Sequence, residues 1–446
     1  MSLANTNNAG IFAGRMVSLP TVVLSSLRIR DFGLPFWAAA IAMPFVCNIE
    51  FALLALLAIQ FVGILRCRAD AGEKFLLCFL LAFAYSGITV FGLRLYDWVL
   101  LVAFAYFVLV RRVRLETSTL LKALIGLCVV LTLLAANYTI GALLQAMRFA
   151  LSLVCCVLFA SVDIGKKRVA CCVMVPVIIA LYCAAVMLAR YGLATNIEGA
   201  LVSTNFFVYD DEVRAAGYFS DPNKFMSFLL FMLFIIDWAK GFRGFHAEYL
   251  PIFAGLFLTG SRTVLICIAL YLAYKAFCSL TKNGLQAVVL LLTVGVVALF
   301  GVLLLSGGDL GGLADKVWNG AAELFGRERT LAINSNLSED GRILIWQQAL
   351  GFISEKAFFG WGLNAYETLL PYPTHNTFLN LLLSGGFVYL LTFLLNVYPV
   401  ATKADFFLFV ALILVPMFLL DLLDYRLLFC LVGLVQFNSA LSKNEV

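Results

Sequence analysis

Long, continuous apolar runs recur along most of this chain and limit what it can fold into. A run of about 20 apolar residues crosses a bilayer as a helix. A backbone surrounded by lipid must satisfy its own hydrogen bonds, either in helices or in a closed barrel. These runs do not alternate between polar and apolar residues as barrel strands do, so they favour helices. The chain is 63% hydrophobic and only 13% charged, whereas a soluble domain is about half apolar and a quarter charged.

We therefore predict an all-α polytopic membrane protein with about 12 to 14 transmembrane helices. The boundaries of the spans are soft, and the short pair 249–260 and 263–279 could be re-entrant instead. We expect spans near residues 33–48, 50–66, 75–93, 97–110, 120–138, 142–162, 169–190, 224–239, 249–260, 263–279, 285–306, 376–399, 405–421 and 426–441.

Lysine and arginine clusters fall in alternate loops and set the expected orientation, because cytoplasmic loops carry an excess of these residues. The formal net charge of +5 fits this bias better than it fits a nucleic-acid partner. Both termini are then cytoplasmic, and two long polar segments, 191–223 and 307–375, face the other side. We divide the chain into N-terminal transmembrane helices, 1–190, and a catalytic transmembrane region, 191–446. The clusters on the cytoplasmic side are Arg66, Arg68 and Lys74; Arg111, Arg112 and Arg114; Lys166, Lys167 and Arg168; Lys240 and Arg243; Lys282; and Lys403.

The second polar segment shows helical periodicity at 314–325 and at 342–354. In the later stretch Ile343, Trp346, Leu350 and Ile353 are spaced to share one stripe. This pattern is typical of a helix that lies on the membrane surface or covers a cavity.

Several arginines fall on the expected outer face, where short loops are normally depleted of them. Arg148 lies just inside a span, Arg214 precedes a span, Arg262 sits in a tight turn, and Arg342 begins a surface helix. Arginine makes bidentate, permanently charged contacts with phosphate, so the set suits a polyanionic ligand. Simpler roles are a buried ion pair for Arg148, capping of helix ends for Arg262 and an ordinary exposed charge for Arg342. The other arginines on this face, which we interpret as snorkelling anchors, are Arg94, Arg190 and Arg426.

His375 is one of only two histidines in the chain. It follows Pro371 and Pro373, which cannot extend a helix backwards, and it stands at the mouth of a long apolar run. We expect the helix to begin near His375 with Thr374 as its cap. Histidine titrates near neutral pH, so this side chain could accept a proton from an attacking hydroxyl. Alternatively it only orients a substrate. His246, in a basic loop, looks structural.

These motifs, taken in order, resemble the O-antigen polymerase and O-antigen ligase superfamily, the Wzy-type polymerases and WaaL-type ligases of bacterial surface polysaccharides. The resemblance covers roughly residues 200–390 in motif terms. It is carried by Arg214 to Asn223 (RAAGYFSDPN), Thr259 to Arg262 (TGSR), Gly341-Arg342 with Trp346, Gly360-Trp361-Gly362, His375-Asn376 and Gly385-Gly386.

The resemblance implies a helical glycosyltransferase similar to the C-type class, multi-pass in the bacterial inner membrane, with its active site and long loop on the periplasmic face. It implies an inverting transfer of a glycan from undecaprenyl diphosphate to an acceptor sugar hydroxyl. The acceptor is a lipid-linked repeat unit for a polymerase and lipid A-core for a ligase. Membrane lipids surround the protein, and a chain-length regulator could be a further partner.

By the same resemblance, His375 and Arg342 match catalytic positions of the family. The residues expected to bind the diphosphate or the acceptor are Arg214, Arg262, Arg148, Asn376, Asp221 and Asn223. The Asp-Pro-Asn that follows Arg214 resembles polymerases more than ligases.

We expect no cofactor and no metal. The outer face carries no Asp-x-Asp motif, and the twelve cysteines lie outside the two long polar segments, which argues against a cysteine-rich metal site or disulfide framework. Arginines could then do the work that a divalent ion does elsewhere. A transporter is a less favoured alternative, because carriers tend to place ionisable groups near the bilayer midplane, whereas here they gather at one face.

Overall fold

The computed structural model describes residues 32–42, 50–86, 88–90, 93–111, 117–161, 206–209, 212–215, 219, 221–240, 249–259, 261–280, 339–403, 409–420 and 426–444. The predicted spans 169–190 and 285–306, the surface helix predicted at 314–325 and Arg190 lie outside the described residues.

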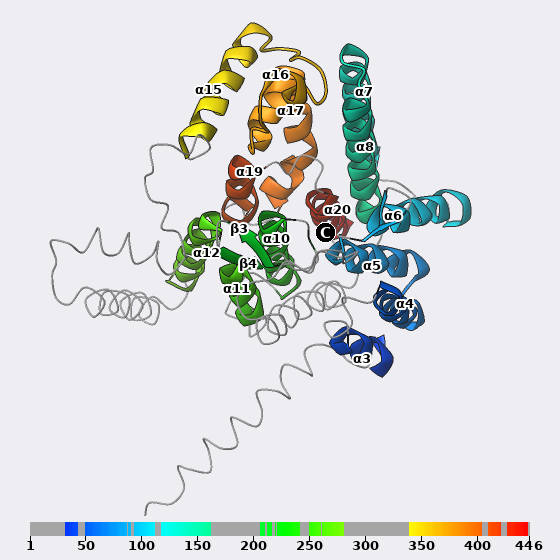
Figure 1. Ribbon diagram of the computed structural model, residues 1–446. Helices are drawn as coiled ribbons and strands as arrows, with labels where there is room; N and C mark the ends of the chain where they lie inside the picture. Colours follow the sequence, from blue (N-terminus) through cyan, green and yellow to red (C-terminus); the bar gives the residue numbers. More distant parts are fainter. Residues whose placement is uncertain are drawn as a thin grey trace, which may run out of the picture.

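Helices make up most of the described chain (Figure 1). Each of the remaining predicted spans contains a helix. Three of the described helices are long and apolar enough to cross a membrane: Thr117–Ala136, Ile140–Ala160 and Thr377–Tyr398. The helices are α3 (Leu34–Ala42), α4 (Glu50–Arg66), α5 (Ala71–Ala84), α6 (Leu95–Tyr106), η2 (Phe107–Arg111, a π-helical turn), α7 (Thr117–Ala136), α8 (Ile140–Ala160), α10 (Pro222–Lys240), α11 (Tyr249–Leu258), α12 (Arg262–Leu280), α15 (Glu339–Glu355), α16 (Tyr366–Leu369), α17 (Thr377–Lys403), η3 (Val410–Leu414, also π-helical), α19 (Val415–Leu419) and α20 (Arg426–Asn444).

Two short antiparallel ribbons interrupt the helical fold, and the expectation of a purely α-helical chain missed them. One joins β1 (Thr89–Val90) to β2 (Leu93–Arg94), and the other joins β3 (Phe206–Tyr209) to β4 (Glu212–Ala215). The run from Phe206 to Tyr209 consists of aromatic and β-branched residues, which favour strands. In a chain dominated by apolar helices, a signal of four residues is easily overlooked.

Helices α7, α8, α17 and α20 pack against one another. The ring of Phe149 on α8 lies 5.6 Å from the ring of Tyr389 on α17 and 5.6 Å from the ring of Phe429 on α20. Gly433 lets α20 approach α8 closely, since a Cβ there would lie 2.5 Å from the carbonyl oxygen of Cys156. These contacts fix the helices that carry the site described below.

Two buried ion pairs connect other helices. Arg426 Nε, at the start of α20, lies 2.6 Å from Asp97 Oδ1 in the first turn of α6, and both side chains are about 5% exposed. Lys275 Nζ on α12 lies 2.7 Å from Asp237 Oδ1 on α10. The interpretation of Arg426 as a snorkelling anchor is therefore wrong. An apolar flank predicts snorkelling only when no carboxylate lies within reach, and Asp97, more than 300 residues earlier, supplies one.

Candidate functional site

The helix that follows His375 is broken in the middle. Gly386 within α17 has φ 59° and ψ −155°, values outside the helical region, so α17 consists of two helical segments joined at this residue. A left-handed backbone angle of this kind is easily adopted only by glycine. The Gly385-Gly386 pair picked out in the sequence therefore marks a break in the helix.

The segment that contains the Gly-Trp-Gly motif closes this break through backbone hydrogen bonds. The N–H groups of Trp361 and Gly362 donate to the carbonyl oxygens of Leu383 and Ser384, at 2.9 and 2.8 Å. In return, the N–H groups of Phe387 and Val388 donate to the carbonyl oxygens of Ala357 and Phe358, at 2.8 and 3.2 Å. In an unbroken helix Phe387 and Val388 would instead bond to Leu383 and Ser384. The loop therefore satisfies all four groups that the break releases.

Close backbone contact explains the glycines on both sides of this junction. A Cβ on Gly360 would lie 2.5 Å from the N of Gly385, and a Cβ on Gly386 would lie 2.3 Å from the carbonyl oxygen of Ala357. Neither position has room for a side chain. The Gly-Trp-Gly motif is thus a structural joint that fixes the segment before His375.

The same loop also rests on the turn between α7 and α8. Asn137 Nδ2 donates to the carbonyl oxygen of Leu363 at 2.7 Å. Gly141, at the start of α8, faces Asn364 and Glu367 so closely that an added Cβ would lie 2.3 Å from Asn364 Nδ2. These contacts connect α8, the helix that carries Arg148, to the loop that leads to His375.

His375 is exposed and lies just outside the helix, with a left-handed φ of 48°. The residue that caps α17 is Asn376, whose Oδ1 accepts the N–H groups of Phe378 at 3.0 Å and Leu379 at 3.1 Å. The prediction that Thr374 caps a helix starting at His375 was therefore wrong by two residues. Asn is a stronger N-cap than Thr, and the cap leaves His375 outside the helix.

Thr374 holds the backbone on the other side of His375. It is buried, and its Oγ1 lies 2.7 Å from Asn380 Oδ1 and accepts the N–H of Asn376 at 3.3 Å. Its carbonyl oxygen accepts the indole N–H of Trp346 at 2.8 Å. The side chain of His375 is thus exposed between two residues that are themselves fixed.

Helix α15 confirms that residues 342–354 are helical, with one correction to the apolar stripe, whereas its place on the membrane surface stays a prediction. Ala349 and Ile353 are buried against Leu383 of α17, whereas Leu350 is 53% exposed. Trp346 lies on the buried side, three residues before Ala349. Arg342 belongs to the turn before Trp346, and residues four apart on a helix lie about 6 Å from each other. The helical turn that contains Arg342 therefore lies next to Trp346, whose indole N–H donates to the carbonyl oxygen of Thr374 in the loop of His375.

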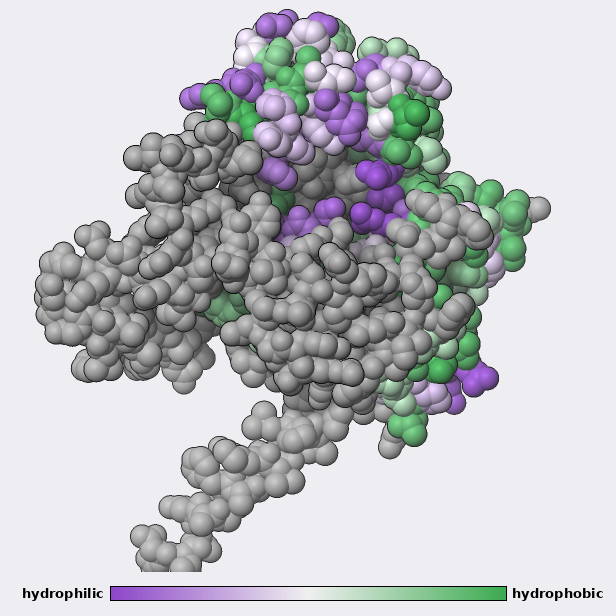
Figure 2. Space-filling view, viewed as in Figure 1, coloured by the Kyte–Doolittle hydropathy of each residue, from purple (hydrophilic) through white to green (hydrophobic). Residues whose placement is uncertain are grey.

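Arg148 lies on the exposed side of α8, so it is not the fully buried charge that the sequence allowed. Its neighbour Phe149 contacts Tyr389 of α17, which places Arg148 on a helix that borders the site. Figure 2 shows strongly hydrophilic residues beneath the α15–α17 end of the molecule.

The remaining candidates belong to the neighbouring elements α10, α11, α12 and β4. Arg214 stands in β4 opposite Phe207, and β4 contacts α10 and α11. Asp221 caps α10, because its Oδ1 accepts the N–H of Asn223 at 2.7 Å. Arg262 is the first residue of α12, where the helix N-terminus favours an anion. None of the contacts described joins Arg214 or Arg262 to His375, so their convergence on one site stays a prediction.

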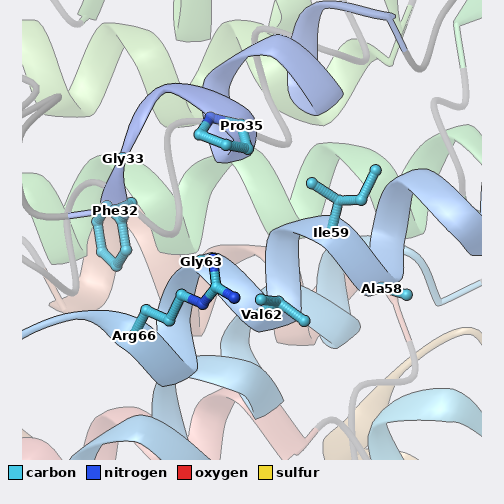
Figure 3. A pocket seen from close by; sticks show the side chains of 8 residues that line it. All are labelled: Phe32, Gly33, Pro35, Ala58, Ile59, Val62, Gly63 and Arg66. Carbon is cyan, nitrogen blue, oxygen red and sulfur yellow. The ribbon is translucent and has the colours of Figure 1, made fainter.

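A separate apolar pocket lies between α3 and α4 (Figure 3). Neither helix carries a candidate site residue, so we do not assign this pocket to the site. The residues that line the pocket are Phe32, Gly33, Pro35, Ala58, Ile59, Val62, Gly63 and Arg66.

Among the described residues, no group of three or more His, Cys, Asp or Glu side chains is arranged to hold a metal ion.

Part of the chain matches a known protein family. Residues 249–394 match a family model described as O-Antigen ligase. The matched region includes Arg262, Arg342, Trp346 and His375, whereas Arg148, Arg214, Asp221 and Asn223 lie outside it. No curated protein and no solved structure matches the chain.

Proposed function

We propose that the chain belongs to the O-antigen polymerase and ligase superfamily, whose family model residues 249–394 match, and that it is a membrane glycosyltransferase that polymerises a bacterial surface polysaccharide. Its donor is a glycan on undecaprenyl diphosphate, and its acceptor is a sugar hydroxyl of another lipid-linked repeat unit. One observation carries the proposal. Within the matched region, the bond from Trp346 to the carbonyl of Thr374 joins the helix of Arg342 to the loop of His375.

The proposed reaction is a single displacement at the anomeric carbon, with inversion. The acceptor oxygen forms the new glycosidic bond while the bond from the anomeric carbon to the diphosphate oxygen breaks. His375 takes the proton of the acceptor hydroxyl as general base. Negative charge grows on the departing diphosphate, and prepositioned guanidinium groups stabilise such charge best.

We assign that stabilising role to Arg342 together with Arg262 and Arg214, and we assign Arg148 to the acceptor or the diphosphate. The structure supports different roles for the other three candidates. The Oδ1 atoms of Asn376 and Asp221 accept backbone N–H groups at helix starts, including that of Asn223. We propose that these residues shape the loops that carry His375 and Arg214, and that they contact substrate less directly.

Reconstitution tests the function and separates its two versions. Purified protein in liposomes receives undecaprenyl-diphosphate-linked repeat units, with and without lipid A-core, and the products are separated on a gel. A ladder of glycans formed without lipid A-core supports the polymerase. Product that appears only with lipid A-core supports the alternative, an O-antigen ligase, and no glycan transfer in either mixture contradicts both.

We propose that the reaction is independent of divalent metal, because arginines take the position that a metal holds in other diphosphate sites. The assay is therefore repeated after exhaustive treatment with EDTA. Full activity is expected. Loss of activity that Mg²⁺ or Mn²⁺ restores would show that the arginine set is not sufficient.

The proposed location is the bacterial inner membrane, with the site on the periplasmic face and both termini in the cytoplasm. The donor supports this placement, since a lipid-linked glycan on the outer leaflet can reach only a site on that face. A carrier remains the alternative class, and transport of the lipid-linked glycan across sealed liposomes without glycan transfer would favour it.

A further inference from the structure

The backbone of His375 adopts a conformation that its neighbours must maintain. A φ of 48° lies in the left-handed region, which is unfavourable for a residue other than glycine. Such conformations persist where the surrounding structure over-determines them. The contacts around His375 therefore decide where its imidazole points.

Two of these contacts are local and one is distant. Asn376 caps α17, and Thr374 bonds to Asn380 and Asn376. The distant contact comes from α15, where Trp346 Nε1 donates to the carbonyl oxygen of Thr374 at 2.8 Å. That carbonyl belongs to the peptide unit that ends at the nitrogen of His375. The indole therefore fixes the plane about which the φ of His375 is defined.

This geometry points to Trp346 as a positioning residue for His375, and this inference rests on the proposed function. The indole N–H holds the peptide before the histidine and thereby sets the imidazole relative to the Arg342 turn on the same helix. The base and the guanidinium must act on opposite sides of the anomeric carbon, the base on the attacking hydroxyl and the guanidinium on the departing diphosphate. A fixed spacing between the two groups lowers the activation barrier more than either group does alone.

A double-mutant cycle tests this role in the full-length protein reconstituted in liposomes. Trp346→Phe keeps the aromatic ring but removes the donor. It is expected to lower turnover about 10- to 100-fold with little change in KM for the donor. In a His375→Ala background the same substitution is expected to change turnover less than about twofold, because residues that act as a unit are not additive.

Trp361→Phe is the matched control. Trp361 Nε1 donates to the carbonyl oxygen of Phe352 at 2.9 Å, six residues further along α15 than Trp346. This variant loses an equivalent indole bond and should keep near-wild-type turnover. Equal losses for the two Phe variants would overturn the inference and reduce Trp346 to a packing residue, and so would an equal effect of Trp346→Phe in both backgrounds.

A second variant covers the case in which Trp346→Phe yields too little folded protein. Thr374→Val retains the carbonyl that Trp346 binds but removes the hydroxyl contacts with Asn380 and Asn376. Its effect should vanish in the His375→Ala background in the same way, and an effect that persists there contradicts positioning. Failure of the proposed function looks different, because the wild-type protein then forms no product in any mixture.

Discussion

Two regions of the molecule, the segment around Gly386 and His375 and the ion pairs between helices, hold their polar groups in different ways. Around Gly386 and His375, backbone N–H and C=O groups, helix caps and close glycine contacts fix the chain, while the imidazole and the Arg148 side chain stay exposed. Elsewhere among the helices, Arg426 is buried against Asp97, and the partly buried Lys275 pairs with the buried Asp237.

The difference separates charges that build the fold from charges that are available to a ligand. Removal of one partner from a buried ion pair destabilises the fold, because the remaining charge stays desolvated. An exposed side chain on a backbone held by hydrogen bonds can instead approach an incoming diphosphate or sugar. Position on the same expected face of the membrane does not distinguish Arg426 from Arg148, whereas burial of the side chain does.

Gly386→Ala should produce the largest effect, since it breaks the joint that holds the loop before His375. The substitution places a Cβ 2.3 Å from the carbonyl oxygen of Ala357 in a left-handed conformation. Strain and loss of the four exchanged hydrogen bonds should together lower the free energy of unfolding by about 5 kcal/mol. Folded yield and thermal unfolding in detergent measure the loss.

Gly351→Ala is the control for that variant. A Cβ on Gly351, in α15, meets nothing within 4 Å, so the change should stabilise the helix slightly. Equal behaviour of the two alanine variants would show that the joint at Gly386 is not needed.

Asp97→Asn should lower stability by about 3 kcal/mol, because it leaves the guanidinium of Arg426 buried without its anion. Turnover of the protein that does fold should remain within about twofold of wild type. Replacing both partners, Asp97→Leu with Arg426→Met, should recover most of the loss.

Asp70→Asn is the matched control for this pair. Asp70 is exposed and caps α5 by accepting the N–H of Gly72, and Asn serves equally well in that position. A large loss of turnover in folded Asp97→Asn protein would move this pair from the fold into the site and erase the contrast.

Asn376→Ala should have the smallest effect on stability, about 1 kcal/mol, from loss of the N-cap of α17. Turnover should fall as well, since the cap fixes the residue after His375. Asn376→Ser restores a capping oxygen and should restore both properties. A serine variant that is stable but as inactive as the alanine variant would show that the amide itself contacts substrate.

Much of the helical architecture could be predicted from the sequence, because apolar runs mark segments that lipid or protein surrounds and basic clusters mark loops in water. The α15 helix was predictable from its periodicity, and the Gly-Trp-Gly and Gly385-Gly386 motifs were singled out by the family resemblance. The sequence could not show that these two motifs meet, since the hydrogen bonds between them join backbone groups that every residue carries.

The role of individual charged and polar residues was harder to predict. Arg426 carries no local sign of its pairing with Asp97, because only the packing of α6 against α8 and α20 brings them together. The link from Trp346 to Thr374 was equally invisible, although Trp346 stands four residues after Arg342 in the motif. Nothing in the sequence separated the capping role of Asn376 from a role in binding.

The central claim is that His375 performs chemistry, and substitution of this residue tests it most directly. Wild type, His375→Ala and His375→Gln are reconstituted with lipid-linked repeat units, and turnover is measured between about pH 5 and pH 9, where histidine titrates. If His375 is the general base, both variants should lose about 10²- to 10⁴-fold in turnover, and the acid limb of the rate profile should disappear. A glutamine variant with near-wild-type turnover and an intact acid limb would contradict the account and leave His375 as a group that only orients the substrate.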